Sequence, residues 1–245
     1  SPKGLLAAVL VMSISTFKLG GGSHFLLTRS LIPSAIAMPL LTGGIYLTAR
    51  KKLAAGMLVS GIGSLFHPLF GLEVCGLLFA GYLGTTLLMN RKLEKSHWKQ
   101  LLISTAILIL FAAPALIIQF SQEKIDTERF IYILAHYRNP HHYIPSRFRT
   151  KDFLAMIAFC CALILTWLRM KTRMDHFSAA YILLLVALIG FACIGGYVFV
   201  ELIPTRIWVI AQVFRLLGIV KWMGLCLFAG MILDEGIPLS TRLIH

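Results

Sequence analysis

The polar residues best suited to chemistry are concentrated in one stretch, His136-Tyr-Arg-Asn-Pro-His-His-Tyr-Ile-Pro-Ser-Arg-Phe148. It contains three histidines and two arginines, and apolar segments long enough to cross a bilayer lie on both sides of it. Arginine can bind phosphate through two parallel N–H donors, and a neutral histidine can carry a proton near neutral pH. The stretch therefore predicts a pocket for a phosphate or diphosphate. Its expected binding residues are Arg138, His142, Tyr143 and Arg147, with His141 as a catalytic proton carrier.

The prolines of this stretch bear on its backbone. Residues that precede proline avoid the helical region, so Asn139-Pro140 and Ile144-Pro145 predict extended or turn backbone, in which the histidines share no helical face. One alternative is an interfacial loop whose Tyr, His and Arg side chains simply suit lipid head groups. A metal site is not expected, because the adjacent His141 and His142 diverge and no carboxylate or Cys completes a ligand set.

Arg215 lies about two turns inside the last long apolar segment. A charge at such depth is costly and faces a protein interior or a watery cavity. Arg215 is therefore predicted to bind an anion within the membrane, and the alternative is a structural ion pair with Glu73 or Glu201. Lys221 is expected to extend toward the far interface.

His67 and Glu73 mark a predicted helix–turn–helix junction, with Pro68 suited to the first position of the second helix. We expect both to be catalytic, with Glu73 as the base or as the group that orients His67. The alternatives are a polar cap of the hairpin, or His67 as an axial ligand to haem or chlorophyll. On the same face, His24 and Arg29 follow the Gly20-Gly21-Gly22 turn and join the predicted binding residues.

Composition indicates what must position these residues. The hydrophobic fraction is 58%, the charged fraction is 13% and the mean hydropathy is +0.83, which is too apolar for a soluble domain of this size. The net charge of +13 does not indicate nucleic-acid binding, because the Lys and Arg residues sit between apolar runs, where anionic lipids attract them. The five cysteines lie within apolar runs and are expected to be small buried hydrophobes. We expect no cofactor.

The apolar runs predict the fold class: an all-α, polytopic integral membrane protein with about eight membrane segments and one domain, residues 1–245. A spanning helix needs about 20 apolar residues. The expected segments are 4–19, 31–49, 53–66, 69–89, 101–120, 152–169, 179–200 and 207–232.

Basic residues predict the orientation. They occupy alternate connections, near 50–52, 91–99 and 169–173, which the positive-inside rule makes cytoplasmic. The loop 121–151, with its His/Arg cluster, then faces the exterior or periplasm.

Small residues at intervals of four predict close helix packing. Gly56, Ser60 and Ser64 form one such seam, and Gly76, Ala80 and Gly84 form a second.

Several of these residues carry a resemblance to a known class. The run Arg138-Asn-Pro-His-His142 resembles the Arg-x-Pro-His-His motif of uncharacterised bacterial multi-pass proteins. Thr28-Arg29, Phe66-His-Pro-Leu-Phe-Gly71 and Val213-Phe-Arg-Leu-Leu217 are similar to pieces of the GT-C glycosyltransferases, which use polyprenyl-phosphate sugars. This resemblance implies a bacterial inner-membrane protein that binds a lipid-linked phosphate at its outer face and transfers a sugar.

The alternative is a non-enzymatic accessory subunit of a larger membrane complex. GT-C enzymes keep a catalytic acidic residue in their first outer loop, and residues 18–30 contain no Asp or Glu, which favours the accessory subunit. A transporter is a third possibility. The expected partners are membrane lipids, among them a polyprenyl phosphate, and other membrane subunits, but not nucleic acid. Because the sequence begins Ser-Pro-Lys-Gly without Met, we expect it to be the later part of a longer protein.

Overall fold

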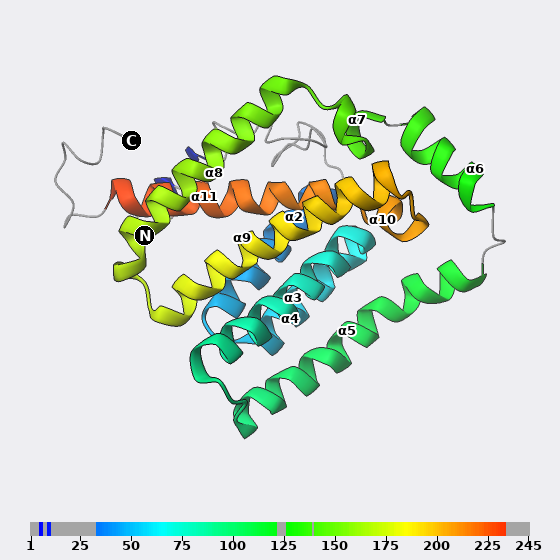
Figure 1. The fold of residues 1–245 in the computed structure, drawn as a ribbon. Helices are drawn as coiled ribbons and strands as arrows, with labels where there is room; N and C mark the ends of the chain where they lie inside the picture. The colour runs from blue at the N-terminus through cyan, green and yellow to red at the C-terminus, as the bar shows by residue number, and fades with distance from the viewer. Residues whose placement is uncertain (1–4, 7–8, 11–32, 122–125, 139, 234–245) are drawn as a thin grey trace.

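The computed structural model describes residues 5–6, 9–10, 33–121, 126–138 and 140–233, and these ranges are all-α (Figure 1). Most of the first predicted segment, 4–19, and the predicted outer loop 18–30 lie outside the described residues. Five helical segments are long and apolar enough to cross a membrane. They are Pro68–Asn90, Lys95–Ile118, Thr150–Arg173, His176–Leu202 and Arg206–Ile232. The chain is thus a multi-pass helical membrane protein.

Two shorter helices precede the first of these spans. α2 (Pro33–Ala49) and α3 (Leu53–Phe66) form a hairpin, and α3 also packs against α4 (Pro68–Asn90) and α5 (Lys95–Ser121). The seam predicted at Gly56 is confirmed, because a Cβ there would lie only 2.7 Å from the carbonyl oxygen of Gly44. The second seam is wrong at Gly76, which is exposed and whose added Cβ would have nothing within 4 Å.

The second half of the chain completes the bundle. α8 (Thr150–Met170) packs against α11 (Leu217–Ile232), and α9 (His176–Tyr197) packs against α4 and the segment before α11. Together with α2 and α3 these helices bury one main apolar core. Lys221 on α11 is only 1% exposed, so the prediction that it extends toward an interface is wrong.

The predicted segment 207–232 is not one continuous helix. α10 (Arg206–Ala211) ends at Gln212, whose φ of 51° and ψ of 42° are left-handed. A left-handed residue cannot continue a right-handed helix. The chain then makes a 3-10 turn, Val213–Leu216, before α11 begins. Arg215 therefore lies in a turn between two helices rather than within a long helix.

The His/Arg stretch is also more helical than its prolines suggested. α6 (Thr127–Ile131) continues into a π-helix, Tyr132–Arg138, and α7 (Pro140–Tyr143) follows before a 3-10 turn, Pro145–Arg147. The expectation of extended or turn backbone is confirmed at Ile144, whose φ of −101° and ψ of 107° are extended. Residues 132–138, 140–143 and 145–147 are helical instead, and Asn139 lies outside the described residues. Pro140 and Pro145 each occupy the first position of a helical turn, where a missing N–H and a fixed φ cost nothing.

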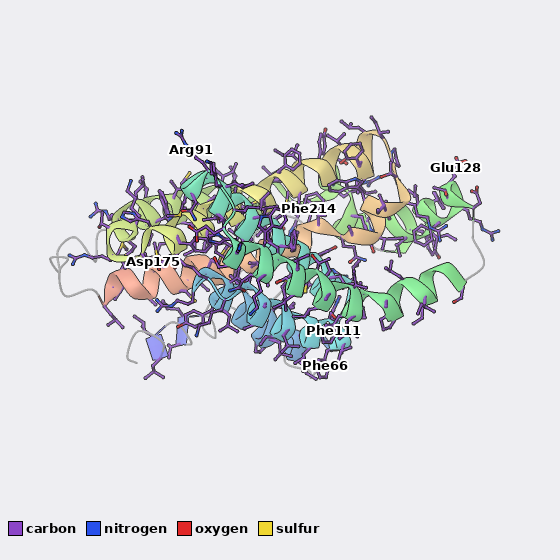
Figure 2. The ribbon with its side chains drawn as sticks, turned by 90° about the horizontal axis from the view of Figure 1, so that it is seen from below. Phe66, Arg91, Phe111, Glu128, Asp175 and Phe214 are labelled. Carbon is purple, nitrogen blue, oxygen red and sulfur yellow. The ribbon has the colours of Figure 1, made fainter. Side chains whose placement is uncertain are left out.

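The connections alternate between the two ends of the bundle. The basic connections near 50–52, 91–94 and 171–175 lie at one end, and α6, α7 and α10 lie at the other (Figure 1). In Figure 2, Arg91 and Asp175 lie toward the first end, Glu128 at the opposite end and Phe214 between them.

Candidate functional site

The contact between Arg215 and His67 brings together two residues that are far apart in the sequence. Arg215 Nη1 lies 3.3 Å from His67 Nε2. The other ring nitrogen, Nδ1, accepts a hydrogen bond of 3.4 Å from the backbone N–H of Phe70 and so caps α4. Burial, and after it the charge of Arg215, lower the pKa of His67, which keeps the imidazole neutral at pH 7.

The hydrogen positions on His67 decide what this contact is. A neutral imidazole has one donor nitrogen and one acceptor nitrogen. If Nδ1 accepts from Phe70, then Nε2 carries the hydrogen and points it at Arg215, which also has only donors. In that tautomer two N–H groups face each other without an acceptor, and an anion placed beside both would satisfy them.

Glu73 is the third member of this group. Both of its carboxylate oxygens are buried, and neither has a hydrogen-bond partner within the described residues. The carboxylate interacts electrostatically with Arg215, yet no ion pair of 4.0 Å or less forms between them. The alternative of a structural pair with Glu201 is not formed either, because Glu201 Oε2 accepts from the backbone N–H of Ser146 at 3.1 Å.

Tyr143 is the one residue of the predicted His/Arg cluster that the described side chains bring to Arg215. It is 3% exposed and interacts electrostatically with the guanidinium. Gln212 Nε2 donates a hydrogen bond to the Tyr143 hydroxyl. The left-handed residue that interrupts the last segment thereby also ties it to α7. We call His67, Glu73, Tyr143 and Arg215 the arginine centre.

The remaining predicted site residues lie elsewhere or are not described. Arg147 is exposed in the 3-10 turn Pro145–Arg147. Arg138, His141 and His142 have helical backbone, but their side chains lie outside the described part, as do His24 and Arg29 entirely. Their predicted roles therefore stay predictions.

Two features of the site were not anticipated from the sequence. Nothing in the sequence marked Gln212 as part of the site, because a single polar residue in an apolar run is common. The second feature is an apolar cavity of about 640 Å³ between α8, α9 and the start of α11. Its lining includes Ser146, Phe148, Cys160, Gly190, Cys193 and Phe214. From the sequence alone, these lining residues cannot be distinguished from side chains that face lipid.

The centre does not resemble a metal or haem site. Among the described residues there is no group of three His, Cys, Asp or Glu side chains that could hold a metal ion. Both ring nitrogens of His67 face protein N–H groups, which disfavours its role as an axial ligand to haem or chlorophyll.

No family model, curated protein or solved structure matches this chain. The function therefore has to be argued from the arginine centre and its surroundings.

Proposed function

We propose that the protein binds the phosphate group of a membrane lipid at the arginine centre. The observation that carries the proposal is the 3.3 Å contact between Arg215 Nη1 and His67 Nε2, which are both donors when Nδ1 accepts from Phe70. A phosphate oxygen beside both nitrogens would accept from both N–H groups and would offset the charge of the guanidinium. When Nδ1 accepts from Phe70, the same two groups without an anion leave a donor facing a donor, which is unfavourable.

The surroundings favour a lipid over a free phosphate ion. Arg215 belongs to a candidate membrane span, and His67 lies between α3 and the first residue of another span. A ligand reaches this region most readily through the bilayer or along its interface. A lipid concentrates there because its chain is apolar, whereas inorganic phosphate has no such drive.

Glu73 suggests what could happen to such a lipid. In glycosyl transfer from a lipid phosphate, an acceptor hydroxyl oxygen would bond to the sugar carbon as the bond from that carbon to the phosphate oxygen breaks. Glu73 would take the hydroxyl proton, and Arg215 would stabilise the departing lipid phosphate. This extension rests on the resemblance to GT-C enzymes and on the unpartnered Glu73 carboxylate. We place the centre on the outer face of a bacterial inner membrane, with a polyprenyl phosphate as the lipid.

An accessory subunit is the second candidate, and α5 favours it. Only 11% of the apolar window in Lys95–Ile118 is buried within the chain, the lowest share among the candidate spans of the described residues. Ile109, Leu110 and Ile117 are each more than 60% exposed. A neighbouring subunit could cover this face, as could lipid.

The test is lipid-phosphate binding by purified protein in nanodiscs, with geranylgeranyl phosphate as the probe. A hydrogen bond to a charged group contributes about 1.5–3 kcal/mol, so Arg215→Gln should weaken binding by roughly 10- to 100-fold. Arg173→Gln removes the same charge from an exposed position at the opposite end and should leave the affinity unchanged.

Intact mass measured from gentle detergent provides the second arm. A phosphate-bearing lipid that co-purifies with the wild type and is lost from Arg215→Gln would support the proposal. Wild-type affinity in Arg215→Gln would refute it. If the protein carried no phosphate lipid and were recovered only with other subunits, the accessory role would be favoured.

A further inference from the structure

We propose that the apolar cavity between α8 and α9 holds the hydrocarbon chain of this lipid, and that the lipid has a single chain. This inference rests on the proposed phosphate site and assigns the other half of the same ligand. The cavity is bounded by α8, α9, the turn Pro145–Arg147 and the segment that follows Gln212.

Two stretches of chain connect the arginine centre to the cavity. Phe214 forms part of the cavity wall, and Arg215 is the next residue, so their Cα atoms are about 3.8 Å apart. Tyr143 belongs to the arginine centre, and two residues later Pro145 begins the cavity lining. The arginine centre and the cavity are therefore built on the same two stretches of chain, so one lipid can have its phosphate at Arg215 and its chain in the cavity.

The volume limits what the cavity can hold. About 640 Å³ lies within the 300–1,000 Å³ range of ligand pockets. A water molecule occupies about 30 Å³ in the liquid, and we take the same volume for each methylene group. On that basis the cavity holds a chain of roughly twenty carbon atoms. It has room for one such chain, and the second chain of a diacyl lipid would have to lie outside it, so we assign a single-chain lipid phosphate.

The lining is chemically suited to hydrocarbon. It consists of aliphatic, aromatic and sulfur-bearing side chains, and its two hydroxyls are those of Ser146 and Tyr197. Ser146 is held in place because its backbone N–H is donated to Glu201. Within the described lining there is no Asp, Glu, Lys or Arg, so a charged group has no partner in the cavity and an apolar chain does.

Gly190 allows the cavity to be filled by substitution. It lines the cavity from α9, and a Cβ added there would have nothing within 4 Å. Gly190→Leu should therefore occupy cavity space without a backbone clash. Gly76 is the matched control, since it is a helical glycine on α4, is exposed, has the same open surroundings and does not line the cavity.

The experiment compares three probes in nanodiscs: geranylgeranyl phosphate, the short-chain isopentenyl phosphate, and phosphatidic acid as a diacyl competitor. Gly190→Leu should weaken geranylgeranyl phosphate binding at least about tenfold and leave isopentenyl phosphate binding unchanged. Gly76→Leu should change neither, and Arg215→Gln should weaken both. Phosphatidic acid should compete poorly in every variant.

The outcomes separate the two proposals. Wild-type binding of geranylgeranyl phosphate by Gly190→Leu, with binding lost in Arg215→Gln, would overturn the chain site and leave the phosphate site standing. Loss in Gly190→Leu with full binding in Arg215→Gln would overturn the phosphate site and, with it, this inference. Equal competition by phosphatidic acid would overturn the single-chain assignment.

Thiol protection gives an independent measurement on the unaltered protein. Cys160 and Cys193 line the cavity from α8 and α9, whereas Cys226 on α11 does not. Bound geranylgeranyl phosphate should slow the reaction of Cys160 and Cys193 with a membrane-permeant maleimide but not that of Cys226, as read by peptide mass spectrometry. Equal rates with and without the lipid would contradict the inference.

Discussion

Asp175 caps α9 at the end of the bundle opposite the arginine centre. Its carboxylate accepts from the backbone N–H of Ser178 at 3.1 Å and from the Ser178 hydroxyl at 2.6 Å, which caps α9. The hydroxyl oxygen also lies 2.9 Å from the carbonyl oxygen of Ala49. Its single proton can be donated to only one of these acceptors at a time. The cap therefore sits at the contact between α9 and the end of α2.

The pKa of Asp175 makes this cap dependent on pH. Burial alone would raise the pKa, but the hydrogen bonds from Ser178 and the charges of Lys51 and Arg50 outweigh it and hold the pKa below its ordinary value of 3.8. A lowered pKa means that the stabilisation is fully present above about pH 3.8 and is lost as the pH falls through the folded-state value.

We predict that Asp175→Ala lowers the free energy of unfolding by about 1 kcal/mol at pH 7. The difference from wild type should shrink as the pH falls below about 3.8, where the wild-type carboxylate becomes protonated. Thermal unfolding in detergent, monitored by tryptophan fluorescence at each pH, measures the destabilisation and its pH dependence. Asp175→Asn is the control, because Asn caps helices as well as Asp but does not titrate. A constant difference down to pH 3 would contradict the role of the charge.

The residues of the arginine centre show how much of the site could be predicted from the sequence. His67, Glu73 and Arg215 stood out because polar groups in apolar surroundings are costly, and Tyr143 stood out as part of the dense His/Arg stretch. Pairings of Glu73 with His67 and with Arg215 were among the alternatives considered. The contact between His67 and Arg215 was not predicted, since it joins residues 148 positions apart and no local pattern encodes it. The donor conflict at His67 likewise depends on the Phe70 N–H, which is visible only once α4 is placed.

At the scale of elements, close approach between helices depends on where glycine faces a neighbour. We predict that Gly56→Ala destabilises the protein by about 1–3 kcal/mol, because its Cβ would lie 2.7 Å from the Gly44 carbonyl oxygen, a backbone atom that cannot move aside. Gly76→Ala should be neutral or stabilising by up to about 1 kcal/mol, because its Cβ enters open space and alanine favours the helix. Unfolding midpoints in detergent compare the two, and equal destabilisation would refute the packing at Gly56.

The positions of the helices could be predicted from the sequence better than the points at which they are interrupted. Length and hydropathy predicted the positions of α2, α3, α4, α5, α8 and α9 to within a few residues, because an apolar run in a bilayer must satisfy its own backbone by forming a helix. The left-handed Gln212 could not be read from its residue type, since glycine or asparagine would be the usual choice there. The helical turns at Pro140 and Pro145 were missed because these two prolines, unlike Pro68, were not considered as first residues of a helix.

At the scale of the whole molecule, the alternation of the connections predicts which surfaces face opposite sides of the membrane. The basic connections near 50–52, 91–94 and 171–175 share one end, whereas α6, α7 and α10 share the other (Figure 1). Cytoplasmic loops carry an excess of Lys and Arg. We therefore expect Lys92 to face the cytoplasm and Ser146, with the mouth of the apolar cavity, to face the opposite side.

Accessibility of single cysteines tests this orientation. In a background with all five native cysteines replaced by alanine or serine, Ser146→Cys should react with a membrane-impermeant maleimide added to intact cells. Lys92→Cys should react only after the membrane is opened. Both positions are exposed, so a failure to react reflects sidedness rather than burial. The reverse labelling would invert the topology, and labelling of both from outside would contradict the alternating spans. The inverted result would place the arginine centre near the cytoplasmic face, so its lipid phosphate would have to be bound from the inner leaflet.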